Sequence, residues 1–328
     1  MKSAWYERQG PAREVLHVGT LPDPEPGPGE VRVRVALSGL NPSDIKTRTG
    51  FAGKPLPFPR IVPHQDGAGT IDRVGAGVPT GRIGERVWLY EAQADRPSGT
   101  AAEYVVLPAA RAVALPDGVP FEVGACLGVP ALTAHRCLFA DGELRGRRVL
   151  VQGGAGAVGS AAIQLAKWAG AWVAATVGRA EQAEIAAAAG ADLVIDRHRE
   201  AVAERVLAAS DGEGVARIVD VDLAANIDTA IACLGRDGVA AAYSAEDPRA
   251  SVAIPFMRAL RAGLAFRFVY VYTMPEAAKR QAIADITACL AAGAYRPAIA
   301  ATLPLERIAE AHEAQESGRT IGKILLAP

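Results

Sequence analysis

One glycine-rich turn constrains this sequence more than any other feature. The run Gly154-Ala155-Gly156-Ala157-Val158-Gly159 follows the apolar stretch Val149 to Gln152 and precedes residues with the apolar spacing of a helix. In such a strand-turn-helix unit we expect Gly154 to make the tight bend, Gly156 to let the backbone approach a pyrophosphate and Gly159 to let the helix lie close on the strand. The turn therefore predicts dinucleotide binding rather than a purely structural glycine turn. The residues expected to bind the cofactor here are Gly154, Gly156, Ala157, Val158 and Gly159.

Apolar strands alternate with helices throughout this part of the sequence. We expect strands at 147–152, 172–177, 193–195, 217–221 and 239–243, with helices at 156–169, 181–189, 200–208 and 225–234 between them. Strands that alternate with helices imply right-handed crossovers and a parallel sheet covered on both faces. The stretch Phe266 to Tyr272, rich in aromatic residues and valine, predicts a sixth strand at the sheet edge. This part is therefore predicted to be a doubly wound α/β domain.

The first 120 residues predict a different architecture. Val31, Val33 and Val35 alternate with arginines in the pattern of a half-buried strand, and the proline-rich run 22–29 before them cannot be helical. Short strands are expected at 69–74, 85–90, 102–107 and 112–115, which predicts a small, mostly antiparallel β domain. Residues 274–328 predict helices at 276–292 and 305–317 and a strand at 323–326, and we expect them to pack back on this first domain.

Charge and composition exclude several classes of function. Thirty-five Lys and Arg residues balance 36 Asp and Glu residues, and no block of like charges stands out, so nucleic acid and anionic membranes are not expected partners. The longest apolar runs are too short to span a membrane, and the first twenty residues carry charges where a signal peptide would be apolar. These features predict a cytoplasmic protein. Its four separated cysteines predict buried thiols, with neither a disulfide framework nor a zinc site.

The end of the second predicted strand indicates which dinucleotide binds. A carboxylate there would favour the ribose hydroxyl of NAD, but Gly178 and Arg179 offer no acid and one guanidinium, which can hold the 2′-phosphate of NADP. Glu181 is the counter-evidence, and we interpret it as a first-turn carboxylate that complements the helix dipole. Arg197, His198 and Arg199 are expected either to join this phosphate site or to be solvated. Tyr243 and Ser244 follow the fifth strand, where such sheets bind ligands, and are expected to contact the cofactor.

Motifs along nearly the whole chain resemble those of the medium-chain dehydrogenase/reductase superfamily. Within it the chain is similar to the zinc-free quinone oxidoreductases of the zeta-crystallin type. The resemblance rests on these segments: Gly39-Leu40-Asn41-Pro42-Ser43-Asp44, Pro63-His64-Gln65-Asp66-Gly67-Ala68-Gly69 and the following Val74 to Val78, Gly84 to Val87, Gly99 to Tyr104, Leu132-Thr133-Ala134, the glycine turn and Gly322-Lys323-Ile324.

This resemblance implies a GroES-like substrate and catalytic domain at 1–123, a Rossmann dinucleotide-binding domain at 124–273, and a C-terminal segment, 274–328, that returns to the first domain. It also implies an active site in the cleft and a homodimer. Phe268, Val269 and Tyr270 are expected to contact the nicotinamide or to pair across the dimer interface, with core packing as a further alternative. Lys323 is expected to contact the cofactor.

The chain departs from the zinc-dependent alcohol dehydrogenases that it also resembles. Asn41 stands where their first metal-binding cysteine would be, Gln65 takes the place of their histidine and Val129 that of their second cysteine. None of the three can be a thiolate or imidazole ligand, and we interpret the neighbouring His64 as a satisfied local donor. The stretch 91–99, where a cysteine-rich lobe would lie, contains no cysteine. No zinc is therefore expected, and alcohol oxidation by a Lewis acid is disfavoured.

Without a metal, the acceptor must yield a stabilised anion when it receives hydride, which quinones and α,β-unsaturated carbonyls do. We therefore expect a metal-free, NADPH-dependent oxidoreductase acting on a quinone. By resemblance, Asn41 is the catalytic residue whose amide donates to the developing oxyanion, with a turn-forming Asn before Pro42 as the alternative. Thr133 is expected to touch the nicotinamide carboxamide or to cap a helix. No residue stands out as the proton donor, and Asp44 is interpreted as a structural hydrogen-bonding group.

Two other functions remain open at this point. One is an NADPH-dependent reductase of enones or enoyl thioesters, since pocket shape decides the substrate on a shared scaffold. The other is a protein that binds the cofactor without catalysis, in a crystallin-like or RNA-binding role, because fold alone does not establish activity.

Overall fold

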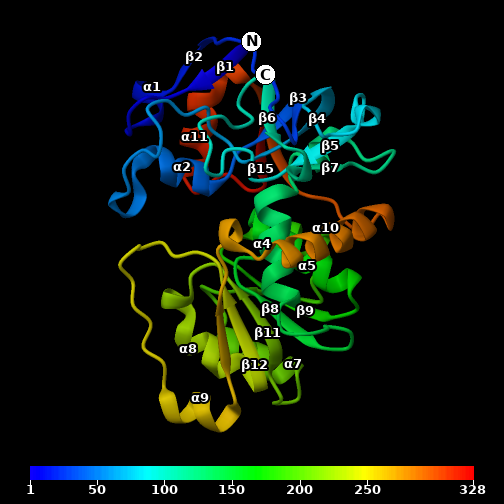
Figure 1. Ribbon diagram of the computed structural model, residues 1–328. Coiled ribbons are helices and arrows are strands. Elements are labelled where there is room, and N and C mark those ends of the chain that lie inside the picture. Colours follow the sequence, from blue (N-terminus) through cyan, green and yellow to red (C-terminus); the bar gives the residue numbers. More distant parts are fainter. The chain divides into compact units, whose positions relative to one another are not determined.

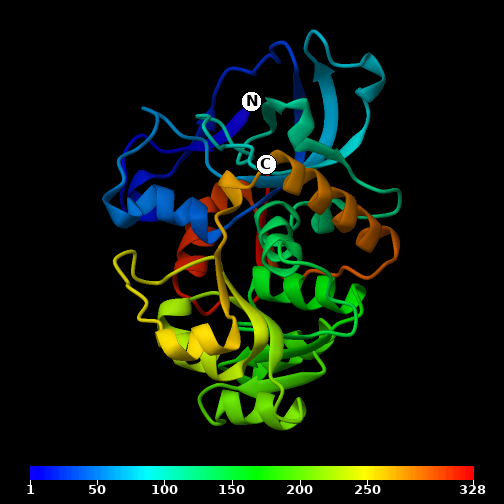
Figure 2. The same cartoon turned by 60° about the horizontal axis from the view of Figure 1, so that its bottom comes forward.

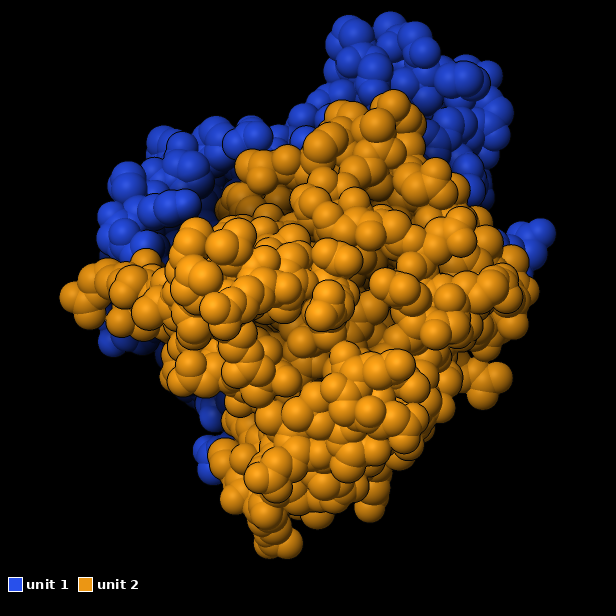
Figure 3. All heavy atoms as spheres, turned by 90° about the horizontal axis from the view of Figure 1, so that it is seen from below, with its two compact units in different colours: residues 1–129, 299–328 blue, residues 130–298 orange.

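The computed structural model describes all 328 residues, which form two compact units. Unit 1 contains residues 1–129 and 299–328, and unit 2 contains residues 130–298 (Figure 3). The predicted α/β class, with one parallel and one mostly antiparallel sheet, is confirmed.

Unit 2 is built on a six-stranded sheet in which every neighbouring pair is parallel. The strand order is β10-β9-β8-β11-β12-β13 (Figure 1). The strands are β8 (Arg148–Val151), β9 (Trp172–Val177), β10 (Leu193–Asp196), β11 (Val215–Asp220), β12 (Leu234–Ala242) and β13 (Ala265–Phe268). Since the chain runs outward from β8 to β10 and then returns to β11, the sheet reverses direction between β8 and β11. Ligands bind at such a switch point in open α/β sheets.

Helices cover both faces of this sheet. Right-handed crossovers place the helices before and after the reversal on opposite faces. Accordingly α5 contacts α6 and α10, whereas α7 contacts α8. The helices are α4 (Gly128–Phe139), α5 (Ala157–Trp168), α6 (Ala180–Ala188), α7 (Val202–Ala209), α8 (Leu223–Cys233), α9 (Phe256–Ala262) and α10 (Glu276–Ala291), with the short η4 (Val271–Thr273). The apolar core between sheet and helices includes Leu150, Ile195, Val206, Ile218 and Ala240.

Unit 1 contains a seven-stranded sheet whose neighbours are antiparallel except for one parallel pair. Its order is β14-β15-β3-β4-β5-β7, with β6 also paired to β3, and β1 and β2 form a separate two-stranded sheet. The strands are β1 (Lys2–Trp5), β2 (His17–Thr20), β3 (Glu30–Gly39), β4 (Asp66–Val74), β5 (Arg86–Leu89), β6 (Tyr104–Pro108), β7 (Ala112–Ala114), β14 (Ile299–Pro304) and β15 (Lys323–Ala327). The alternating valines of β3 pack in the core with Ile71 and Leu107, as their period predicts.

Short helices complete unit 1. They are α1 (Ala12–Val15), α2 (Pro42–Thr49), η1 (Phe51–Gly53), η2 (Thr80–Arg82), η3 (Ala109–Arg111), α3 (Phe121–Gly124), η5 (Leu305–Arg307) and α11 (Ile308–Glu316). The sequence patterns did not predict the helices α1, α2, α3, α4 and α9 or the strands β1, β2 and β14. The turn expected at Asn41 to Asp44 is instead the start of α2, with Pro42 in its first turn, where a missing N–H is tolerated.

The unit boundaries differ from the predicted ones. The first lies after Val129 rather than 123, and the second lies after Ala298 rather than 273. Helix α10 was expected to return to the first domain, but it belongs to unit 2 because it packs on α5 (Figure 2). Two hydrogen bonds also hold this region within unit 2. The backbone N–H of Arg296, after α10, donates to the Gln164 side chain of α5, and the His135 imidazole of α4 bonds to Asp285 of α10 at 2.7 Å. Only β14, α11 and β15 return to unit 1. In neither unit does any helix have the length and apolarity to cross a membrane.

Candidate functional site

The carboxyl ends of the unit 2 strands form one continuous edge. Backbone N–H groups just beyond each strand donate to the neighbouring strand's end: Arg197 to Val177, Gly154 to Thr176, Gln152 to Val219, Tyr243 to Asp220 and Val269 to Ala242. A single sheet edge therefore carries the glycine turn and four other predicted cofactor residues: Gly178, Arg197, Tyr243 and Val269.

The glycine turn has the geometry of a phosphate-binding loop, with one change from the expected roles. The tight bend is at Gly153, which has φ +75°, rather than at Gly154. A Cβ on Gly154 would lie 2.8 Å from the Ala175 Cβ, and one on Gly159 would lie 2.2 Å from the Gly153 carbonyl oxygen. These two glycines thus allow close packing of α5 on the sheet, as expected for Gly159.

Gly156 is the residue that leaves space above the turn. It is the N-cap of α5, and the nearest atom to a Cβ placed there is the Gly153 carbonyl oxygen at 3.4 Å. The first backbone N–H groups of a helix, here those of Ala157 and Val158, lack partners within the helix and favour an anion. The open space and the N–H groups suit a pyrophosphate.

Two basic side chains converge over Gly178, directly after β9. A Cβ on Gly178 would lie 3.1 Å from His198 Nε2 and 3.4 Å from Arg197 Nε. Both side chains are exposed, and neither forms a hydrogen bond or ion pair within the chain. The absence of a Cβ at Gly178 lets these two nitrogen-bearing side chains lie close over the end of β9. Arg179 is half-buried and occupies the N-cap position of α6.

A cavity of about 300 Å³ opens at the ends of β12 and β13. Tyr243, Ser244 and Val269 line it, so the structure brings these three predicted residues together. The sequence analysis missed other lining residues, among them Leu223, Val252 and Thr273. Desolvation raises the pKa of the Tyr243 phenol, which therefore stays protonated at neutral pH. Thr133 lies in the middle of α4 and is buried, so the helix-cap alternative for it is wrong.

Unit 1 buries a polar cluster around Asp66. The Lys323 ammonium donates to Asn41 Oδ1 at 2.5 Å and to Asp66 Oδ2 at 2.9 Å, and Asn41 Nδ2 donates to Asp66 Oδ2 at 2.8 Å. Asp66 Oδ1 accepts from the backbone N–H of Val129 at 2.8 Å. All three side chains are at most 3% exposed. Predicted residues Asn41 and Lys323 therefore meet, through an aspartate that was not predicted as a site residue.

Neighbouring polar groups are also committed to partners. Asp44 accepts from the backbone N–H of Asn41 at 2.7 Å, which agrees with its expected structural role. Burial raises the pKa of Asp44 to about 8. The Gln65 amide donates to Gln93 Oε1 and accepts from the Gln93 backbone N–H, both at 3.1 Å. The positions compared with zinc ligands thus hold an amide bonded to an ammonium, an amide bonded to another amide, and a valine.

His64 belongs to a buried chain of hydrogen bonds. Its Nε2 lies 3.0 Å from His312 Nε2 and its Nδ1 lies 2.8 Å from Ser38 Oγ, which in turn lies 2.8 Å from Thr100 Oγ1. Both imidazole nitrogens of His64 are therefore satisfied, as the sequence interpretation expected. The Arg48 guanidinium donates to His312 Nδ1 at the other end. His312, which is 248 residues from His64, could not have been paired with it from the sequence.

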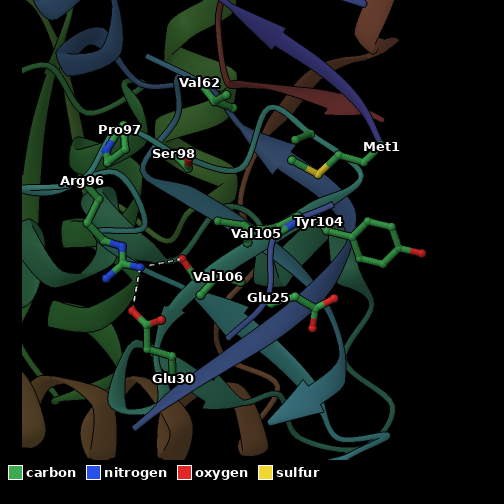
Figure 4. Close-up of a pocket in the computed structure, with 13 residues that line it drawn as sticks. Met1, Glu25, Glu30, Val62, Arg96, Pro97, Ser98, Tyr104, Val105 and Val106 are labelled. Carbon is green, nitrogen blue, oxygen red and sulfur yellow. Dashed lines mark hydrogen bonds and ion pairs between the residues drawn. The ribbon is translucent and has the colours of Figure 1, made fainter. Parts of the chain in front are cut away.

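A second cavity, of about 220 Å³, lies in unit 1 between the start of β3, β6 and the loop 96–99. Figure 4 shows the Arg96 side chain turned to Glu30, with which it forms an ion pair at 2.7 Å. None of the predicted site residues lines this cavity. The four cysteines are all buried and unpaired, as predicted, and burial raises the pKa of each thiol.

Known families match most of the chain. A model described as an alcohol dehydrogenase GroES-like domain matches residues 27–117, and one described as a zinc-binding dehydrogenase matches residues 189–326. A quinone oxidoreductase of Pseudomonas aeruginosa is 32% identical over 293 residues, which cover 88% of both sequences.

Solved structures agree with the fold over the full length. A crystal structure of an NAD-dependent alcohol dehydrogenase has a TM-score of 0.89 at 31% identity and covers all of both chains. The Escherichia coli quinone oxidoreductase complexed with NADPH has a TM-score of 0.85 at 26% identity, again over all of both chains.

Proposed function

This chain belongs to the medium-chain dehydrogenase/reductase superfamily, close to its quinone oxidoreductases, and we propose that it is a metal-free, NADPH-dependent reductase of quinones. The coarser function, an NAD(P)-dependent oxidoreductase related to quinone oxidoreductases, follows from that membership. When bound, the nicotinamide supplies a hydride to the acceptor. The chain's own residues bind and orient the reactants.

The choice of NADPH rests on the place over Gly178. Arg197 and His198 hold two nitrogens close over Gly178, at the strand end where a dinucleotide places its adenosine ribose. No carboxylate terminates β9, where one would favour NAD. The similar Escherichia coli structure contains NADPH, whereas the similar alcohol dehydrogenase is named for NAD, so relatives alone do not decide.

The side chains around Asp66 are the main support for a metal-free mechanism and for a quinone as the substrate. Zinc in proteins prefers thiolate, imidazole or carboxylate ligands that are free to bind it. Here the only carboxylate of the cluster accepts from Lys323, Asn41 and Val129, and Gln65 is bonded to Gln93. These residues do not fit zinc, although the matched family model is described as zinc-binding. Quinones suit such a site because their reduced anion is delocalised and needs no Lewis acid.

Asn41 is the proposed donor to the acceptor oxygen. Its second amide N–H makes only a 3.5 Å contact with the Gly39 carbonyl oxygen, a weak hydrogen bond that an incoming oxyanion can replace.

Steady-state turnover with NADPH tests the proposal. We expect reduction of 1,4-benzoquinone and 9,10-phenanthrenequinone, a preference for NADPH over NADH, and no stoichiometric zinc by elemental analysis. A simple enone and an enoyl-CoA are the comparison acceptors. Turnover of these two alone would transfer the function to an enone or enoyl-thioester reductase, and bound zinc would disprove the metal-free mechanism.

We also propose a homodimer through the open edge of β13. This strand pairs only with β12, and Phe268 and Tyr270 are 73% and 58% exposed. Helix α9 adds Phe256 and Leu260, which are 71% and 60% exposed. An unpaired strand edge beside exposed apolar side chains favours pairing with a second copy. Sedimentation should therefore give a dimer, and Phe268→Glu should give a monomer. A monomeric native chain would contradict this assembly.

A further inference from the structure

The buried ammonium of Lys323 closes a ring of three side chains in unit 1. It donates to both Asn41 and Asp66, and Asn41 donates to Asp66. Gly128 allows this arrangement, because a Cβ there would lie 2.1 Å from Asp66 Oδ1. The Val129 N–H then reaches Asp66 Oδ1. The ring is thus anchored to the backbone at the start of α4 and at the start of β15.

The ring leaves the Asn41 amide only one orientation. An ammonium has only donors and a carboxylate has only acceptors. The Asn41 carbonyl oxygen must therefore face Lys323, and the NH2 group must face Asp66. A flipped amide would set NH2 against the ammonium and oxygen against the carboxylate. The two opposite charges thus fix which end of the Asn41 amide is oxygen and which is nitrogen. Neutral neighbours would allow either orientation.

We infer that Lys323 is a positioning residue. Its buried ammonium, paired with Asp66, orients the Asn41 amide so that the second N–H, which makes only a weak contact with the Gly39 carbonyl oxygen, can donate to the acceptor oxygen. This rests on the proposed function of Asn41. It differs from the expectation that Lys323 contacts the cofactor, because at least two of its three donors are committed to Asn41 and Asp66.

The orientation can be measured directly in the full-length protein. Nitrogen-15 spectra report the side-chain NH2 pair of each asparagine, and the Asn41 pair is assigned by its loss in Asn41→Ser. In Lys323→Met we expect the Asn41 pair to shift and to exchange faster with water. The matched control is Lys279→Met, which removes another buried lysine, 3% exposed, from unit 2 and should leave the Asn41 pair unchanged.

Turnover and cofactor binding give a second readout. Lys323→Met should lower kcat about 100-fold, the order of loss seen for a misplaced reacting group, with the NADPH dissociation constant unchanged. Lys323→Met leaves the buried Asp66 carboxylate without its cation, which destabilises the protein. The double variant Lys323→Met/Asp66→Asn removes this unpaired charge and so separates stability from catalysis. It should regain melting temperature while kcat stays low and the Asn41 signals stay shifted.

Each alternative has its own outcome. An unchanged Asn41 pair in Lys323→Met would overturn the inference, and so would a kcat that recovers together with stability in the double variant. Weaker NADPH binding at unchanged kcat would assign Lys323 to the cofactor instead. If the native enzyme reduces no quinone while the Asn41 signals respond as expected, the proposed substrate fails but the positioning role stands.

Discussion

Single glycines in the phosphate-binding turn have separable roles, although the sequence pattern treats them alike. Gly159 leaves no room for a side chain, since its Cβ would lie 2.2 Å from a backbone oxygen. Gly156 has ordinary helix-start dihedrals, φ −70° and ψ 162°, and a Cβ there would make only an ordinary contact, 3.4 Å from the Gly153 carbonyl oxygen. Packing thus requires glycine at 159, whereas the proposed cofactor site is the reason for glycine at 156.

Alanine at these two positions should therefore give opposite results. Gly159→Ala should lower the free energy of unfolding by about 1–3 kcal/mol, because the new Cβ would clash with the backbone at Gly153, which cannot move away easily. Gly156→Ala should keep the melting temperature but weaken NADPH binding, because the methyl group occupies the space for the pyrophosphate. Thermal melts and fluorescence titrations with NADPH measure the two effects. Equal melting temperatures for both variants would contradict the packing role of Gly159.

Arg197 and His198, which lie over Gly178, are expected to share one role. We expect Arg197→Ala and His198→Gln each to weaken NADPH binding while NADH binding stays unchanged. Removing one charged hydrogen bond costs about 1.5–3 kcal/mol, or roughly tenfold to a hundredfold in affinity. The matched comparison is Arg179→Ala, because Arg179 is the guanidinium that the sequence favours for the 2′-phosphate. If Arg179→Ala alone changes the preference for NADPH, the anion site lies at α6 rather than over Gly178.

Elements of unit 1 are tied together by the buried histidine chain. It joins α2, α11, β3 and the loop before β4 through Arg48, His312, Ser38 and His64. Its hydrogen bonds have one direction, because Arg48 can only donate at one end and the Asp66 carbonyl oxygen, which accepts from Thr100, can only accept at the other. His312 must then donate from Nε2 and His64 from Nδ1. Both imidazoles are neutral, and neither can gain a proton without breaking a bond.

Acid should therefore destabilise unit 1. Burial lowers the pKa of His64 to about 3 and lowers that of His312 as well. Between the ordinary imidazole value of about 6.5 and these lower values, only the unfolded chain binds the protons. Stability is thus complete above about pH 6.5 and falls as pH decreases, by about 1.4 kcal/mol per pH unit for each imidazole.

Denaturation from pH 7 to pH 5 measures this loss. His64→Asn is the test variant, since His64 has φ +80° and asparagine tolerates that conformation. The variant should be less stable at pH 7, but its stability should fall less steeply with acid. Parallel curves for the native chain and the variant would show that His64 does not resist protonation.

The division of the molecule into two units predicts which fragments of the chain fold on their own. Residues 130–298 include α10, which covers α5, whereas the boundaries expected from the sequence, 124–273, remove it. We expect the fragment 130–298 to melt cooperatively and to bind NADPH, because the strand edge and the glycine turn lie within it. The fragment 124–273 should expose the apolar face of α5 and aggregate. A stable 124–273 fragment would contradict the structural role of α10.

Local patterns were sufficient for much of this protein. The parallel sheet follows from alternating strands and helices, and the glycine turn follows from six adjacent residues, because periodicity and backbone sterics act over short distances. Strand β14 and helix α2 were missed: the first is an exposed edge strand with a weak pattern, and the second was masked by its Asn-Pro start.

The polar site depended on long-range contacts instead. Asn41 and Lys323 are 282 residues apart, and neither residue type nor spacing indicates that they bond. A buried lysine is stable only where the fold supplies a carboxylate. That carboxylate, Asp66, precedes the strand predicted at 69–74, and nothing in the sequence marked it as a site residue. Local backbone geometry was therefore enough to predict the dinucleotide-binding fold. The pairing of the charges around Asn41 could not be predicted in this way, because it exists only after distant segments have packed.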